Sequence, residues 1–185
     1  MKKFTAIFLA ALMALSFAAC GSKTTEEKVS ITDSLELLTT VIGGYDEADL
    51  FPVCGGDSAN LNFEGPGKFD AANAEELDIT LGFPTSHSDK IDDAASMMNA
   101  MMANNFTAGV YRVTDEKNVE TVAADLKDNI LARQWMCGMP EKMVVISVGN
   151  YVVSAFGLSD ALDTFKAEIS EAYPSASVLY EEAVI

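Results

Sequence analysis

The sequence is poor in the residues on which most catalytic and nucleic-acid sites depend. It has one histidine, one tryptophan and three cysteines in 185 residues. Lys and Arg number 12 against 28 Asp and Glu, which gives a formal net charge of −16. Phosphate backbones and anionic headgroups repel such a chain. We therefore expect no nucleic-acid partner.

The chemical motifs of the commoner enzyme classes are absent as well. The single histidine, His87, has serine and aspartate neighbours, but catalytic groups are usually brought together from separate loops. The sequence contains no glycine-rich phosphate loop, no zinc-ligand spacing and no twelve-residue calcium loop. We therefore predict no catalytic residue, no metal and no cofactor. Many carboxylates are present, so an enzyme remains the alternative to a binding protein.

Only one apolar run is long enough to suggest a membrane or export role. It extends from Phe4 to Ala19, follows Lys2 and Lys3, and ends in small residues before Cys20. A membrane-spanning helix needs about 20 apolar residues, which is more than this run has. A basic start, a short apolar run and small residues are typical of an export signal.

The residues around Cys20 resemble a bacterial lipoprotein signal. Phe17-Ala18-Ala19-Cys20 is followed by Gly21-Ser22, and leucine is usual where this chain has Phe17. The resemblance implies that the Cys20 thiol carries a diacylglyceryl group and becomes the first residue of the mature protein. The membrane would then be a partner, with the domain on its extracytoplasmic face. A cleaved, soluble exported protein is the alternative.

The chain divides into three parts on this interpretation. Residues 1–19 are the signal, residues 20–30 a lipidated cysteine and polar tether, and residues 31–185 a single domain. Within the domain, Cys54 and Cys137 can form a disulfide, as exported cysteine pairs do. The alternative is two separate thiols buried in the core.

Most elements of the domain follow from periodicity and turn signals. Met143 to Gly157 contains two apolar runs that flank Gly149-Asn150, which is typical of a β-hairpin. Helical spacing and breaker residues predict a helix over Thr32–Ile42, a turn-rich stretch over 45–69, and a short helix over Asn73–Leu81. Further on they predict a strand over Phe106–Val113, a helix from Thr114 or Asp115 to about Met136, a helix capped by Ser159, and an edge strand from Ser177. Residues 94–102 fit a helix or a strand equally well.

The order from residue 106 is strand, helix, strand, strand, helix, strand. It predicts an α+β fold with a ferredoxin-like split βαβ sheet, in which both helices cover one face of the sheet.

A second resemblance concerns the domain itself. An Ala-Ser-Met-Met-Asn segment (residues 95–99), the Arg133-Gln134 pair and a Gly-Asn-Tyr-Val hairpin (residues 149–152) follow the lipoprotein signal. Together they are similar to bacterial lipoproteins catalogued only as a domain of unknown function (family 4358). The resemblance implies that residues 94–102 form an extra N-terminal strand paired with Phe106–Val113. It implies no activity.

The most suggestive surface candidate is the segment that follows the predicted helix. Trp135, Met136 and Met139 combine an aromatic ring with flexible apolar side chains, as partner surfaces do. They can equally close one end of the core. Our first hypothesis is a lipid-anchored module of the cell envelope that binds an unidentified protein or small ligand. The alternatives are an envelope enzyme that uses carboxylates around residues 45–69, and a purely structural surface protein.

Overall fold

The protein is described by a computed structural model that covers residues 30–101, 105–136 and 138–184. Its strands are β1 (Val53–Cys54), β2 (Gly67–Phe69), β3 (Ile91–Asn99), β4 (Thr107–Val113), β5 (Lys142–Val148), β6 (Tyr151–Gly157) and β7 (Ser177–Ala183). Its helices are α1 (Ser34–Gly43), α2 (Ala74–Leu81), α3 (Val119–Ala132) and α4 (Ser159–Ala172), with 3-10 helices η1 (Thr85–Lys90) and η2 (Glu116–Asn118). The α+β class is therefore confirmed. The signal, Cys20 and nearly all of the tether lie outside the described residues.

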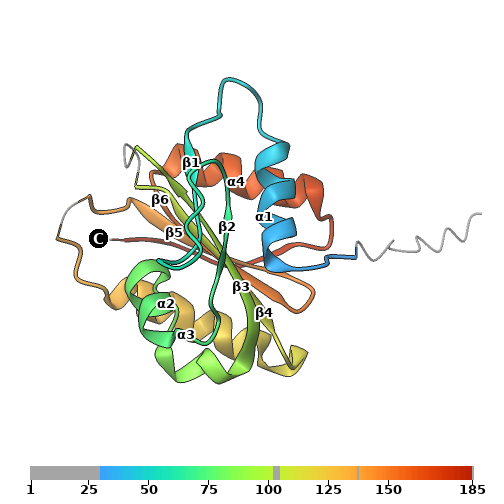
Figure 1. The fold of residues 1–185 in the computed structure, drawn as a ribbon, viewed down its shortest axis with the longest axis vertical. Helices are drawn as coiled ribbons and strands as arrows, with labels where there is room; N and C mark the ends of the chain where they lie inside the picture. Colours follow the sequence, from blue (N-terminus) through green and yellow to red (C-terminus); the bar gives the residue numbers. More distant parts are fainter. Residues whose placement is uncertain (1–29, 102–104, 137, 185) are drawn as a thin grey trace, which may run out of the picture.

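All seven strands belong to one antiparallel sheet with helices on both of its faces. The strand order is β1-β3-β4-β6-β5-β7, and β2 also pairs with β3. Figure 1 shows α1 and α4 on one side of the sheet and α2 and α3 on the other. Leu38, Phe165 and Val153 contribute to the first core, and Leu81 and Val152 to the second. The described chain is thus a three-layer sandwich with two hydrophobic cores.

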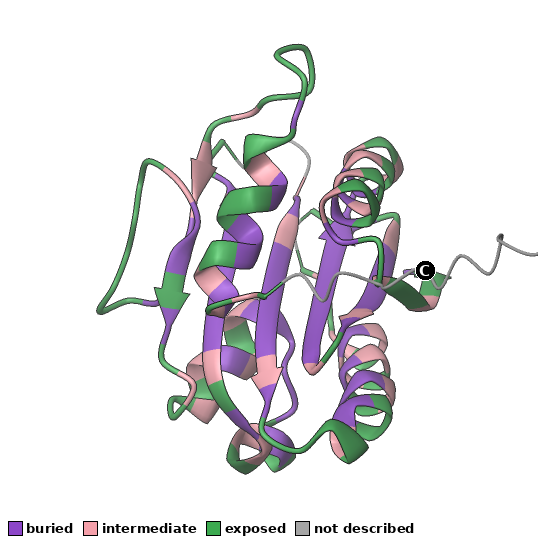
Figure 2. Ribbon diagram, turned by 90° about the vertical axis from the view of Figure 1, so that its right-hand side faces the viewer, coloured by how far each residue is buried: buried purple, intermediate pink, exposed green. Residues whose placement is uncertain are grey.

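The predicted hairpin is confirmed as β5 and β6, joined at Gly149 and Asn150. Gly149 has a φ of +59°, which the first central position of a hairpin turn requires and glycine adopts without strain. All seven residues of β6 are buried. Because side chains alternate between the two faces of a strand, full burial means that both faces are covered. Figure 2 shows the same for the middle strands, whereas the helices expose their outer sides.

The ferredoxin-like arrangement predicted from residue 106 onward is not confirmed. In that arrangement the last strand lies beside the first, and both helices share a face. In this protein β3 occupies the free side of β4, and β7 pairs with β5 at the far edge. Two crossovers, β4-α3-β5 and β6-α4-β7, therefore move in the same direction across the sheet. Because β4 and β6 are antiparallel, right-handed crossovers then place α3 and α4 on opposite faces.

Residues 94–99 of the ambiguous segment belong to a strand, as the family resemblance implies, residues 100 and 101 form a turn, and residue 102 lies outside the described residues. β3 spans Ile91–Asn99 and pairs with β4 from Ile91 opposite Val113 to Met98 opposite Thr107. The turn-rich stretch before it contributes β1 and β2, which both pair with β3. An extra N-terminal strand is therefore confirmed, and two shorter strands accompany it.

Two helix ends differ from the prediction. The helix expected to reach about Met136 ends at Ala132, and Arg133 takes an extended conformation. Ser159 is not the side-chain cap of α4, because Leu158 occupies the capping position and offers no side-chain acceptor. Instead, the Glu141 carboxylate accepts a hydrogen bond from the Ser159 backbone N–H at 2.9 Å. A side chain distant in sequence thus satisfies this helix start.

Candidate functional site

The segment after α3 divides into a packed residue and two exposed ones. The Trp135 ring contacts the ring of Phe156 in β6, with centroids 5.1 Å apart. Met136 is 93% exposed and Met139 is 54% exposed. Trp135 therefore closes one end of the core, while the two methionines face solvent.

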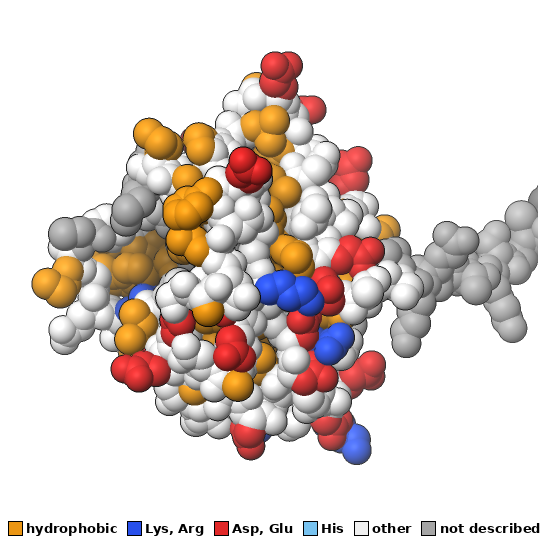
Figure 3. Space-filling view, in the orientation of Figure 1, with side chains coloured by type: hydrophobic (Ala, Val, Ile, Leu, Met, Phe, Trp, Pro, Cys, Tyr) orange, Lys and Arg blue, Asp and Glu red, His pale blue; other side chains and the backbone are white. Residues whose placement is uncertain are grey.

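A pocket of about 380 Å³ opens beside Trp135. We call it the Trp135 pocket, and its walls include Met98, Ala100, Phe106, Arg133, Trp135 and Phe156. The strand register explains why these residues meet. Met98 of β3 lies opposite Thr107 of β4, which in turn lies opposite Phe156 of β6. Three neighbouring strands thus present one end to the segment after α3. Figure 3 shows hydrophobic side chains around a hollow at the left of the molecule.

Arg133 reaches this pocket because α3 ends just before it. Its Nη2 donates a hydrogen bond to the Ile79 carbonyl in the last turn of α2, at 2.6 Å. The negative end of the α2 dipole favours a cation at this position. The residue after α2, Gly82, has a left-handed φ of 72°, and a Cβ there would approach the Arg133 Nη1 to 3.2 Å. A glycine at this helix end therefore leaves space for the guanidinium.

The Arg133 guanidinium is half-buried and stacks on two aromatic rings. Its Cζ lies 4.8 Å from the Trp135 ring centroid and 5.5 Å from that of Phe156. Such cation–π contacts stabilise a partly desolvated cation. Burial lowers the pKa of Arg133, and the negative charge of Asp78 opposes this effect. The residue stays charged at neutral pH, because an arginine pKa lies far above that range.

Two nitrogens on this segment have no hydrogen-bond partner among the described residues. They are Arg133 Nη1 and Trp135 Nε1, and both are buried. Arg133 also takes part in none of the ion pairs between described residues, whereas Lys68, Arg112, Lys127, Lys142 and Lys166 all do. Buried donors that lack an acceptor are rare and costly. The pocket therefore has largely apolar walls, and two of its lining side chains carry a hydrogen-bond donor that lacks an acceptor.

Cys54 also lines the Trp135 pocket and forms no disulfide with another described residue. Burial raises the pKa of the Cys54 thiol, which lowers its reactivity. The predicted disulfide partner, Cys137, lies outside the described residues. Its neighbour Gly138 lines the same pocket as Cys54. The disulfide between Cys54 and Cys137 stays a prediction.

His87 connects η1 to α3 and is not part of a catalytic triad. It is buried in η1, and its Nε2 is 2.5 Å from the Asp125 Oδ2 on α3. Its Nδ1 is 2.7 Å from the Lys90 Nζ. Both ring nitrogens are thus occupied by neighbours. The Ser88 hydroxyl donates to the Thr85 carbonyl instead of to the imidazole.

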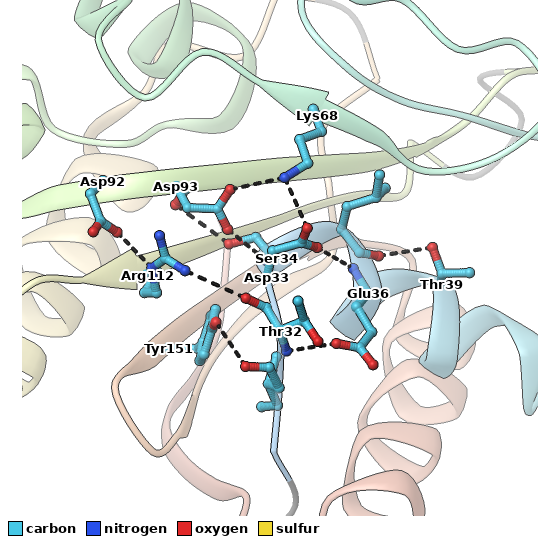
Figure 4. Close-up of polar contacts among 12 residues, drawn as sticks. Thr32, Asp33, Ser34, Glu36, Thr39, Lys68, Asp92, Asp93, Arg112 and Tyr151 are labelled. Carbon is cyan, nitrogen blue, oxygen red and sulfur yellow. Dashed lines mark hydrogen bonds and ion pairs between the residues drawn. The ribbon is translucent and has the colours of Figure 1, made fainter.

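The carboxylates near the start of α1 are engaged in a polar network (Figure 4). Asp33 caps α1 by accepting from the Glu36 N–H at 2.8 Å, and Asp93 of β3 accepts from the Ser34 N–H at 2.6 Å. Lys68 bridges the two carboxylates at 2.9 and 3.4 Å. This network fastens the first helix to the sheet.

The buried acid of the 45–69 stretch, Asp57, is bound to backbone donors. Asp57 is buried and accepts from the backbone N–H groups of Ala59, Asn60 and Asp70. Burial raises the pKa of Asp57, but these donors outweigh it and the net pKa is lowered. Six described carboxyl groups have a pKa that departs clearly from the ordinary value, and in each of them the pKa is lowered. They are those of Asp33, Glu36, Asp57, Glu141, Asp163 and Glu181. A general acid needs a raised pKa.

The described residues contain no group of three or more His, Cys, Asp or Glu side chains that could hold a metal ion. Within the same ranges, no helix is long and apolar enough to span a membrane.

Comparison with known proteins finds no matching family profile, curated protein or solved structure. The resemblance to lipoproteins of family 4358 therefore stays a prediction.

The sequence singled out Trp135, Met136 and Met139 but not Arg133 as a site residue. Arg133 entered only through the resemblance, as half of the Arg133-Gln134 pair. An arginine two residues before a lone tryptophan, just after a helix, was the available signal. The strand ends that complete the pocket are distant in sequence and gave no local sign.

Proposed function

We propose that this protein is a lipid-anchored extracytoplasmic binding protein and that its ligand enters the Trp135 pocket. The anchor is the diacylglyceryl group on Cys20. The polar tether then connects the membrane to the domain, and the high negative charge keeps the domain soluble and away from anionic headgroups.

One observation supports the binding site above all others. The Trp135 pocket has largely apolar walls, and two of the side chains that line it carry a covered donor without a partner, Arg133 Nη1 and Trp135 Nε1. Ligand sites are usually apolar hollows with a few polar groups that orient the ligand. The alternative, an enzyme built on carboxylates, receives less support because Asp57 of the 45–69 stretch and Asp93 of β3 already have partners.

A ligand screen with a pocket-filling variant tests the site. The melting temperature of the full-length protein is measured with a diverse set of small organic compounds. A ligand present at about 100 times its Kd stabilises a fold by roughly 2.7 kcal/mol, or about 5–10 °C for a chain of this size. Ala100 is exposed and lines the pocket, so Ala100→Phe should abolish the shift.

The control is Ala59→Phe, which adds the same side chain at an exposed position in another loop. It should bind as the wild type does. A screen without any stabilising compound, or a shift that survives Ala100→Phe, would contradict the assignment of the pocket.

The anchor is tested separately by labelling cells with palmitate. The wild-type protein should incorporate the label, and Cys20→Ser should not. Label that persists in Cys20→Ser would reject lipidation at this residue and favour a cleaved, soluble exported protein.

A further inference from the structure

The donors in the Trp135 pocket restrict what its ligand can be, and this argument rests on the function proposed above. A guanidinium has only donors, and an indole nitrogen is a donor only. A ligand group that satisfies both must therefore accept at least two hydrogen bonds. A carboxylate offers acceptor positions on two oxygens and no donor, whereas an amine or ammonium offers no match.

The charge of the pocket points in the same direction. Among the described residues that line it, Arg133 alone is charged. No described carboxylate forms an ion pair with Arg133, although the chain carries 28 acids. A half-buried cation that no described carboxylate contacts, and that Asp78 affects only from a distance, gains from an anion that arrives from outside. One guanidinium balances one negative charge, so a monoanion fits better than a phosphate dianion.

The remaining walls indicate the rest of the ligand. Met98, Phe106 and Phe156 are apolar, and the volume of about 380 Å³ suits a small molecule and not a macromolecular chain. An apolar body would bury its surface against these side chains. The ligand class that meets every condition is a small carboxylic acid with an aromatic or branched apolar body.

Binding also requires a small rearrangement. Arg133 Nη1 and Trp135 Nε1 are both covered in the structure, so a ligand reaches them only when these side chains turn toward the pocket that they line. This side-chain movement exchanges two existing interactions for contacts with the ligand. They are the hydrogen bond from Arg133 Nη2 to the Ile79 carbonyl and the stacking of Arg133 on the Trp135 ring. We infer that the Trp135 pocket binds a small apolar monocarboxylate through Arg133 and Trp135.

Three probes of one shape test this inference. They are phenylacetate, its neutral amide phenylacetamide, and the cation phenethylamine, titrated calorimetrically into the full-length protein. A charge-assisted hydrogen bond contributes enough to favour the anion over the amide by roughly tenfold to a hundredfold. The cation should not bind. The overall negative charge repels phenylacetate, so a preference for it must come from the pocket itself.

Arg133→Gln should remove the preference for the anion over the amide, and Arg112→Gln is the matched control. Arg112 undergoes the same change of charge but pairs with Asp92 at 2.7 Å, outside the pocket. The control should keep the wild-type preference. If circular dichroism shows that Arg133→Gln does not fold, Arg133→Lys replaces it, and a preference that is reduced but retained is expected because the charge remains.

Each contrary result has a distinct meaning. Equal binding of phenylacetate and phenylacetamide overturns the anionic class but leaves the pocket as a binding site. If neither phenylacetate nor phenylacetamide binds, while other compounds stabilise the wild type but not Ala100→Phe, the ligand class alone is overturned. Inorganic phosphate that displaces phenylacetate at lower concentration overturns the monocarboxylate. A preference lost equally in Arg112→Gln and Arg133→Gln overturns the role of Arg133.

Discussion

A single buried carboxylate organises the loop from Gly55 to Asp70. Asp57 accepts hydrogen bonds from the backbone N–H groups of Ala59, Asn60 and Asp70, at 2.9, 2.7 and 2.6 Å. This arrangement replaces the secondary structure that the loop lacks between β1 and β2. Because three backbone N–H groups converge on it, the carboxylate has a structural role, although the Asn60 N–H is also 3.1 Å from the Asp57 backbone carbonyl.

Asp57→Ala should therefore destabilise the protein by about 2 kcal/mol, since it removes the charged acceptor of three part-buried backbone hydrogen bonds. Asp57→Asn keeps one acceptor oxygen and should cost less. The free energy of unfolding is measured by urea denaturation, with Asp46→Ala as the exposed control. A cost for Asp57→Ala no larger than that of the control would show that the loop does not depend on this carboxylate.

Two exposed glycines make a matched pair for testing the backbone. Gly149 and Gly43 both have open space where a Cβ would lie, but only Gly149 has a positive φ. Gly149→Ala should destabilise by about 1 kcal/mol because of left-handed strain alone. Gly43→Ala, at the end of α1, should stabilise by about 0.5 kcal/mol through the unfolded state. Thermal unfolding that gives both variants the same sign would contradict this assignment.

At the scale of elements, ion pairs hold the edge strand β7 to its neighbours. Glu181 of β7 contacts Lys142 of β5 at 2.9 Å and Lys166 of α4 at 2.8 Å, and both lysines also contact Asp163. Hydrogen bonds from Lys166 and then Lys142 lower the pKa of Glu181. These pairs are partly exposed, so their total contribution is modest.

The lowered pKa fixes the sign of the pH dependence. A carboxylate whose pKa is lower in the folded state stabilises the fold above its unfolded value of about 4.3, and this stability is lost as the pH falls further. Glu181→Gln should therefore lose less stability than the wild type between about pH 5 and pH 3, by up to about 1 kcal/mol.

The comparison is made by urea denaturation across this pH range. Glu171→Gln serves as the control because Glu171 is exposed on α4 and outside these ion pairs. Identical pH profiles for the wild type and Glu181→Gln would show that the pairs do not stabilise β7.

The elements themselves were accessible from the sequence because their signals are local. Gly149 marks the hairpin, and Leu162, Phe165 and Ile169 repeat along the apolar side of α4. The position of β7 in the sheet could not be predicted from the sequence, because local signals do not show which of the two sheet edges an edge strand joins. β3 takes the place beside β4 that a ferredoxin-like fold leaves to the last strand. The position of β7 at the far edge also places α4 on the face opposite α3.

At the scale of the whole molecule, the sequence indicated only part of the candidate site. Trp135 is conspicuous as the single tryptophan beside a helix end. Arg133 lies on the same segment, but Ala100 and Phe156 come from other parts of the fold and reach the pocket only through strand register. Composition and motifs gave no reason to expect a phosphate loop or a metal site, and they could not show that Arg133 forms no ion pair with a described acid. A charge without a partner is visible only in three dimensions.

The emission of Trp135 tests the central claim most directly, because no other tryptophan contributes to it. Phenylacetate is titrated into the full-length protein, into Ala100→Phe and into Ala59→Phe while the emission is recorded. We expect a saturable change in the wild type and in Ala59→Phe, with the same Kd as calorimetry gives, and no change in Ala100→Phe. Calorimetric binding without any change in Trp135 emission would place the ligand elsewhere and contradict the account.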